Sequence, residues 1–272
     1  MFSRSRMICG LLGVMVLAWA MMRPPALMAA SIPLALTGFN ADVVTENSAT
    51  PSAVRFDGGT AAWFEAGLGG HADGLPNSRV FVNDGSSGTT NTGTTFMFQP
   101  YTGNNVLRLL PGATSGSLTL VTPGSFTQLA ILASSGSGGG TGNALLHFSN
   151  GTTTNITYSA VDWNQNSNPP GPAAIGNLGR NENVGTAGTS FTYGKPVPFA
   201  MYETDINLLS LGLSGLTLTS VDFTGLAGSA AVTGVFALSA TPTPDPATLI
   251  LCGLGGLGLL GFAWRRSRIA IP

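Results

Sequence analysis

The chain has 272 residues, of which only 8% are charged, and its formal net charge is −1. A typical soluble domain has about 25% charged residues, so this protein is unusually poor in charge. Between residues 31 and 246, five Lys and Arg stand against twelve Asp and Glu, a net charge of −7. Nucleic-acid binding needs a basic surface that displaces counterions from phosphates. The composition therefore excludes nucleic acid as a partner.

The first 30 residues predict a secretory signal peptide. Arg4 and Arg6 give a positive start, residues 7–22 form an apolar stretch, and Ala29 and Ala30 form a small-residue cleavage zone. This order of features is typical of signal peptides. The alternative is an N-terminal membrane anchor that is not cleaved. In both cases we expect the following residues to be exported.

Residues 31–240 predict one all-β ectodomain, a β-sandwich or jelly roll. Short runs of β-branched and aromatic residues are separated by Gly, Asn, Asp, Ser and Pro. Many short strands with close turn signals are typical of such folds. The expected strands are 53–56, 61–65, 79–82, 94–99, 105–110, 117–121, 128–133, 144–148, 153–158, 190–193, 199–203, 216–223 and 231–239. Only residues 208–218 have a helical pattern, which two glycines weaken.

One hairpin can be predicted to its register. Residues 149–151 form a three-residue loop whose glycine takes the left-handed conformation. This loop pairs Leu146 with Thr154 and places Ile156 and Tyr158 on the same face as Leu146. His147 then points to the opposite face, where we expect it to be exposed or hydrogen-bonded.

Trp163 is the candidate for a glycan contact. It ends a predicted strand just before residues 164–189, which we expect to form a long irregular connection. Long loops in compact domains are often functional, and exposed aromatic rings offer an apolar face for stacking sugar rings. Trp63 lies within an alternating strand next to Phe64, and we assign it to the core.

Three aspartates are candidates for calcium binding. Asp57, Asp73 and Asp84 each precede a glycine in a predicted turn, and calcium prefers oxygen ligands of this kind. None of the three belongs to a complete EF-hand loop. Calcium is the only cofactor that the sequence suggests.

The sequence contains no recognisable catalytic motif. The ectodomain has two histidines, His71 and His147, without the spacing of a zinc site or the elbow motif of a serine hydrolase. Paired carboxylates can hydrolyse glycosides, but the spacing of the acidic residues selects no pair. The candidates are Asp57, Glu65, Asp162, Glu182, Glu203 and Asp205. We therefore expect a protein without catalytic residues.

The C-terminal residues predict a membrane tether. Residues 241–246 form a proline-rich spacer, which we expect to lift the ectodomain off the membrane. Residues 247–264 are apolar without interruption and just long enough to cross a bilayer as a helix. Residues 265–272 form a basic tail whose Arg265, Arg266 and Arg268 place the carboxyl end on the cytoplasmic side. A buried core helix is the alternative, and three arginines at its end argue against it.

This tail resembles the PEP-CTERM sorting tail of exported bacterial proteins. Pro244, Asp245 and Pro246 stand where that family has Pro-Glu-Pro, and an apolar helix and an arginine cluster follow. Asp245 keeps the carboxylate but is one methylene shorter than glutamate. The resemblance covers about the last thirty residues. It implies recognition of the tail by an exosortase-type enzyme in the bacterial membrane, followed by cleavage.

Three functions remain open from the sequence. The first is an exported surface or matrix protein without catalytic activity. It would be held at the inner membrane and then sorted to the cell surface or to extracellular polysaccharide. The second is a carbohydrate-binding module that uses Trp163. The third is a glycoside hydrolase or lyase on a jelly-roll scaffold, which needs two carboxylates at catalytic separation in one cleft.

Overall fold

The structure is a computed structural model that describes residues 29–83, 85, 93–111, 115–164, 173–182, 184, 191–192, 198–226 and 231–244. The described residues confirm the all-β prediction, because they form strands and one short 3-10 turn, η1 (Leu68–Gly70). The strands are β1 (Ile32–Pro33), β2 (Leu36–Thr37), β3 (Val44–Thr45), β4 (Trp63–Phe64), β5 (Val80–Asn83), β6 (Thr94–Met97), β7 (Leu107–Leu109), β8 (Ser115–Gly136), β9 (Gly140–Phe148), β10 (Thr153–Ala160), β11 (Ile175–Leu178), β12 (Arg180–Asn181), β13 (Phe191–Thr192), β14 (Phe199–Asn207), β15 (Thr217–Thr224) and β16 (Val232–Pro242).

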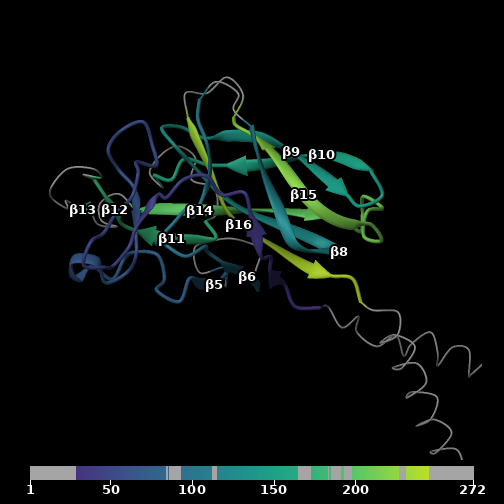
Figure 1. Ribbon diagram of the computed structural model, residues 1–272, viewed down its shortest axis with the longest axis horizontal. Coiled ribbons are helices and arrows are strands. Elements are labelled where there is room, and N and C mark those ends of the chain that lie inside the picture. The colour runs from purple at the N-terminus through teal and green to yellow at the C-terminus, as the bar shows by residue number, and fades with distance from the viewer. Residues whose placement is uncertain are drawn as a thin grey trace, which may run out of the picture.

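A ten-stranded antiparallel sheet organises the described residues (Figure 1). Its main path runs β1-β16-β8-β15-β9-β10, while β14 and β2 also pair with β8, β7 pairs with β16 and β11 pairs with β14. The long strand β8 connects the two parts of this sheet. The first half of β8 pairs with β15, and its second half pairs with β16 and β14. Three two-stranded pairs, β3-β4, β5-β6 and β12-β13, lie outside this sheet.

Strand β8 replaces two predicted strands, 117–121 and 128–133. The sequence suggests a break at Pro123, because proline has no N–H for a ladder hydrogen bond. In the structure Leu218 pairs with Gly124 and Ser220 pairs with Thr119. The register shift between these two pairs is a bulge that contains Pro123, so β8 continues without a break.

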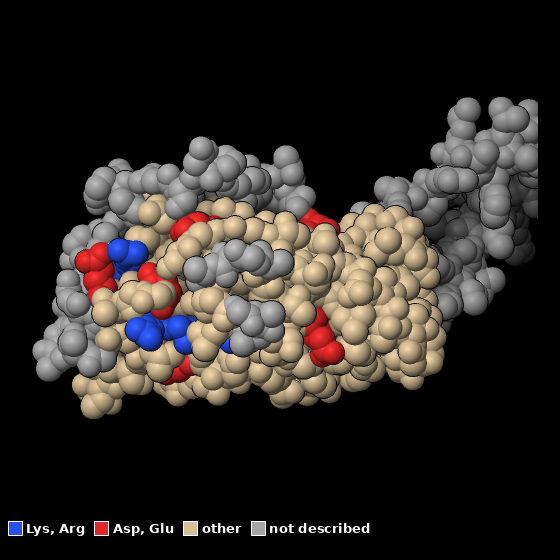
Figure 2. All heavy atoms as spheres, turned by 90° about the horizontal axis from the view of Figure 1, so that it is seen from above, with Lys and Arg blue, Asp and Glu red and all other residues tan. Residues whose placement is uncertain are grey.

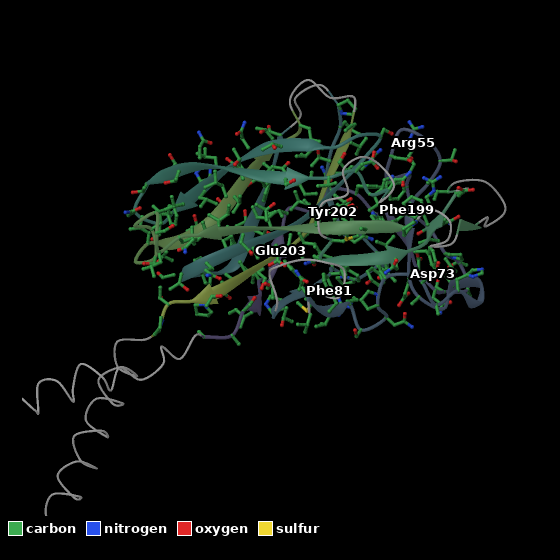
Figure 3. All side chains as sticks on the ribbon, turned by 180° about the vertical axis from the view of Figure 1, so that it is seen from behind. Arg55, Asp73, Phe81, Phe199, Tyr202 and Glu203 are labelled. Carbon is green, nitrogen blue, oxygen red and sulfur yellow. The ribbon has the colours of Figure 1, made fainter. Side chains whose placement is uncertain are left out.

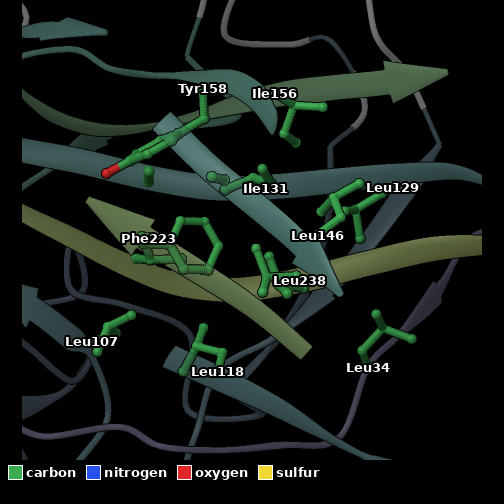
Figure 4. Close-up of a cluster of buried hydrophobic side chains, with 14 of the residues drawn as sticks. Leu34, Leu107, Leu118, Leu129, Ile131, Leu146, Ile156, Tyr158, Phe223 and Leu238 are labelled. Atoms are coloured by element: carbon green, nitrogen blue, oxygen red, sulfur yellow. The ribbon is translucent and has the colours of Figure 1, made fainter. Parts of the chain in front are cut away.

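The sheet is buried on both faces where β8, β14 and β16 pair. Successive side chains of a strand point to opposite faces. Leu129 and Ile131 of β8 enter one apolar cluster, while Ala130 and Leu132 enter another. Figure 4 shows the first cluster, in which side chains from β8, β9, β10, β15 and β16 meet. This double burial explains why the β16 sequence is almost uniformly apolar or small.

The predicted hairpin is confirmed by β9 and β10. Leu146 pairs with Thr154, and the loop glycine Gly151 has a φ of 84°. Ile156 and Tyr158 are buried with Leu146 in the first cluster. The local loop chemistry and the alternation of apolar side chains fix this register together.

Several predicted segments are wrong. Residues 53–56 form no strand. Residues 208–216, whose helical pattern is weakened by two glycines, form turns. The predicted irregular connection 164–189 contains β11 and β12, which pair with β14 and β13. Strands of only two residues, such as β1 and β2, were missed because their sequence signal is too short.

The last strand extends two residues past the predicted boundary at residue 240. β16 continues to Pro242, which pairs with Phe126, and the Thr243 N–H donates a 3.0 Å hydrogen bond to the Ser125 carbonyl. The first three residues of the predicted 241–246 spacer therefore belong to the folded body. In the part of the chain that the structure describes, no helix is long and apolar enough to span a membrane. The segment 247–264 lies outside that part.

Candidate functional site

Two carboxylates lie side by side on one face of β14. The strand alternation that buries Phe199 and Met201 in the second apolar cluster directs Glu203 and Asp205 to the same face. Figure 3 shows Phe199 and Glu203 following each other along the strand. One face of β14 therefore changes from apolar to acidic towards the end of the strand.

The carboxyl group of Glu203 affects that of Asp205. Glu203 Oε2 accepts a 2.5 Å hydrogen bond from Asn83 Nδ2, and Asn83, the last residue of β5, is buried. The pKa of Asp205 is raised to about 7, first by burial of its carboxyl, then by its hydrogen bond with Glu203 and by the charge of Glu203. At neutral pH the carboxyl of Asp205 is therefore about half protonated.

Asp205 lines a groove with a volume of about 290 Å³. Its floor consists of the small residues Ala130 and Ser239, because Asp205 pairs with Ala130 across β14 and β8, and Ala130 pairs with Ser239 across β8 and β16. Thr94 and Gln128 add hydrogen-bonding groups to its rim. Residues 29–31 close the groove on the side opposite Asp205.

The two side chains offer hydrogen-bonding groups to a ligand. A carboxylate accepts hydrogen bonds, and a protonated carboxyl also donates one. Because the pKa of Asp205 is raised to about 7, its carboxyl can do either near neutral pH. This chemistry suits the hydroxyl groups of a ligand.

A second hollow of about 460 Å³ lies on the outer face of β8, β15, β9 and β10. Asn143, Asn155 and Asp222 line it. On the same face, His147 Nε2 lies 2.7 Å from Asp222 Oδ2, which confirms His147 as a hydrogen-bonded sheet residue. The pKa of Asp222 is lowered, mainly by a hydrogen bond from Ser117 and then by His147.

The prediction that Trp163 offers an exposed stacking surface is wrong. Only 2% of its surface is exposed, and its ring contacts Phe56 and Trp63 at centroid distances of 5.0 and 5.1 Å. Phe199 packs on it as well, and the Arg180 guanidinium lies 5.5 Å from the ring centroid. Trp163 follows β10 into the second apolar cluster, where it is a core residue. The assignment of Trp63 to the core is confirmed.

The structure describes two of the three calcium candidates, Asp57 and Asp73. Asp57 Oδ1 accepts a 2.9 Å hydrogen bond from the Gly59 N–H, as in an Asx turn. Asp73 packs against Gly179, and Figure 3 places it far from Glu203, towards the opposite end of the body. Asp84 lies outside the described residues. Within the described ranges, no three His, Cys, Asp or Glu side chains gather in a way that could hold a metal. Calcium binding stays a prediction.

The sorting residues lie at the edge of the described chain. Pro244 is exposed and follows Thr243 directly. Asp245, Pro246, Arg265, Arg266 and Arg268 lie outside the described residues. The signal peptide prediction also falls there, apart from Ala29 and Ala30.

Glu203 and Asp205 are both among the six acidic candidates from the sequence, but the sequence does not indicate that these two form a pair. The predicted strand ended at Glu203, whereas β14 continues to Asn207. Extending the strand by two residues would have placed Asp205 on the same face as Glu203. The role of Asn83 was missed because it contacts Glu203 across 120 residues of sequence.

Comparisons with known proteins find only distant likenesses. No family model and no curated protein matches the chain. Among solved structures, it is similar to the Agl-KA catalytic domain (TM-score 0.29) and to the catalytic domain of a GH87 α-1,3-glucanase in complex with nigerose (TM-score 0.31). Each is 12% identical and covers 80% of this chain, which spans only 29% and 30% of their length. A family 29 carbohydrate-binding module is also similar, with a TM-score of 0.23, 12% identity, and coverage of 64% of this chain and 93% of the module. At these TM-scores the likenesses support no inference about fold or function.

Proposed function

We propose that this protein is an exported, surface-displayed β-sandwich that its C-terminal segment tethers to the bacterial membrane until an exosortase-type enzyme sorts it. The signal peptide delivers the body across the membrane, and residues 247–264 retain it there. Recognition of Pro244, Asp245 and Pro246 then allows transfer to the cell surface or the extracellular matrix. The body acts by display and binding rather than by catalysis.

The position of the motif supports this proposal most directly. The folded body ends at Thr243, whose backbone N–H and side-chain hydroxyl both donate to the Ser125 carbonyl. The sorting motif begins at the next residue and is followed by the apolar segment and the arginines. A protease or transferase that cuts after the folded body would therefore release it intact. The burial of both sheet faces supports the sandwich.

Alanine substitution of Pro244, Asp245 and Pro246 together is expected to block sorting. In a bacterium with an exosortase, the wild-type chain should lose its tail and leave the membrane fraction. The triple variant should stay there at the mass of the uncut precursor. Pro242→Ala is the matched control, because Pro242 belongs to β16 and lies outside the motif. Immunoblots of fractionated cells measure both species. A wild-type chain that stays in the cytosol with both ends intact would refute the proposal.

The second hollow favours a further candidate function, the binding of a polysaccharide. Asn143, Asn155 and Asp222 present amide and carboxylate groups along an exposed sheet face, and such groups hydrogen-bond sugar hydroxyls. The acidic body disfavours an anionic polymer through charge repulsion. The expected ligand is therefore a neutral extracellular polysaccharide.

Replacing Asn143 and Asn155 with alanine is expected to weaken polysaccharide retention at least several-fold. Both side chains are exposed, so the fold should be unaffected. Affinity electrophoresis in gels that contain neutral polysaccharides measures the effect. Asn47→Ala, which removes an exposed amide near η1, is the control. Equal retention of the double variant and the wild type on every polymer would rule out this surface.

A further inference from the structure

The folded body is tied closely to the start of the predicted membrane span. Thr243 is hydrogen-bonded to Ser125 of β8, and the span begins at residue 247. Four Cα–Cα steps of extended chain reach at most about 14 Å. The polar headgroup layer of one leaflet is itself about 5–8 Å thick. If the tether of the proposed function holds, at most about 6–9 Å therefore remain between the body and the headgroup layer.

The end of the body beside this exit carries two exposed leucines. Leu209 and Leu211 are 62% and 50% exposed, and both belong to the turn of residues 208–216 that follows β14. The Leu209 N–H donates a 3.0 Å hydrogen bond to the carbonyl of Thr127, two residues along β8 from Ser125. The two leucines therefore lie next to the point where the chain leaves the sheet. In Figure 1 this turn and the end of β16 lie at the same end of the body.

The turn holds these leucines outwards. Leu208 and Leu213 flank them and are buried in the first apolar cluster. The Leu213 N–H donates a 2.8 Å hydrogen bond to the Leu208 carbonyl, and Asn207 Oδ1 accepts a 2.9 Å hydrogen bond from the Ser210 N–H. The exposure of Leu209 and Leu211 is thus built into a closed, anchored turn.

This end of the body also carries few charges, and Asp205 lines a hollow together with Ser210 and Leu211. The sequence has no Asp, Glu, Lys or Arg between Asp205 and Asp222, or between Arg108 and Asp162. In Figure 2 the charged side chains on the visible face gather mainly towards the opposite end. A surface with few charges is repelled only weakly by an anionic leaflet, and its apolar parts lose little hydration on entering the interface.

We propose that Leu209 and Leu211 insert into the headgroup interface of the leaflet from which the C-terminal segment emerges. The surface they form is a membrane-docking surface, and its partner is the lipid bilayer. Burial of exposed apolar side chains in the interface is favourable. The short tether keeps the two leucines in reach of the interface at all times. Docking fixes the orientation of the body and holds the sorting motif at the membrane surface.

A fluorescent label at position 210 tests this proposal. The full chain, with Cys9 and Cys252 replaced by serine, carries Ser210→Cys with an environment-sensitive dye and is inserted into phosphatidylcholine–phosphatidylglycerol vesicles. The dye should shift to the blue, and iodide in the water should quench it several-fold less than the same dye at Ser48→Cys. Ser48 is exposed on the segment that neighbours η1, away from the exit. A lipid-borne quencher should reach only the dye at position 210.

Two variants separate docking from tethering. Leu209→Ser with Leu211→Ser should return the dye to water, while the chain still floats with the vesicles. Val80→Ser with Val82→Ser, which changes two exposed valines of β5, should leave the signal unchanged. A dye that is exposed in the floating wild-type chain overturns the docking proposal alone. A dye that is protected without vesicles shows that another copy covers the leucines, and it also overturns the proposal. A chain that does not float overturns the tether and, with it, the docking surface.

Discussion

Replacing Trp163 with alanine is expected to lower the free energy of unfolding by about 3–5 kcal/mol, the usual cost of removing a large buried aromatic side chain. The variant loses ring contacts to Phe56, Trp63 and Phe199 and leaves a cavity among them. It also removes the ring beneath the Arg180 guanidinium. Urea unfolding followed by circular dichroism measures the change.

The matched control is Trp163→Phe, which keeps an aromatic ring in the cluster and should cost clearly less. Any loss of polysaccharide retention in Trp163→Ala should follow the loss of folded protein. A variant that unfolds at the wild-type urea concentration but no longer binds polysaccharide would contradict the core assignment. It would restore Trp163 as a contact residue.

The free energy of unfolding is expected to fall by about 2 kcal/mol as the pH rises from 5 to 8. The pKa of Asp42 is raised to about 6, mainly by burial, and the pKa of Asp205 to about 7. An unfolded aspartate has a pKa of about 3.9. Between these values the folded state binds more protons than the unfolded state, so stability is lost as the pH rises. Both carboxyls keep contact with solvent, which screens their charges. Each therefore changes the free energy of unfolding by well below about 1.4 kcal/mol for each unit by which its pKa is raised.

The two aspartates should act in different pH ranges. Asp205→Asn should remove the loss of unfolding free energy that extends to about pH 7. Asp42→Asn should remove the loss that ends near pH 6. Asparagine keeps an oxygen that accepts the hydrogen bond from Asn105 Nδ2, so the fold around position 42 is preserved. Urea unfolding at several pH values measures the slopes. An unchanged slope in the double variant would show that neither carboxyl carries the effect.

The parts of the fold that depend on local sequence could be predicted. The β9-β10 hairpin was correct to the residue, because a three-residue loop and a run of alternating side chains fix its register. The continuity of β8 could not be predicted, because a bulge opposite β15 accommodates Pro123. Two-residue strands such as β1 exist because β16 offers them a partner, and no short sequence signal shows this.

The candidate site could be predicted only in part, because some of its contacts join segments that are far apart in the sequence. Alternation along a single strand is enough to pair Glu203 with Asp205, once the strand is extended far enough. The contact from Asn83 and the burial of Trp163 depend on packing between segments about 100 residues apart. A tryptophan at the end of a strand looks equally suitable for a core or for a sugar-binding face. Only the folded arrangement distinguishes the two.

The position of β16 has a mechanical consequence if the body is tethered through its C-terminal segment, as proposed above. A pull on the tail enters the body at Thr243 and runs along β16, which pairs with β8 from Val232 to Pro242 and with β1 on its other edge. Hydrogen bonds of an antiparallel ladder are perpendicular to the strands, so this force shears many of them together instead of opening them one by one. A body tethered in this way would resist drag without its last strand being peeled away.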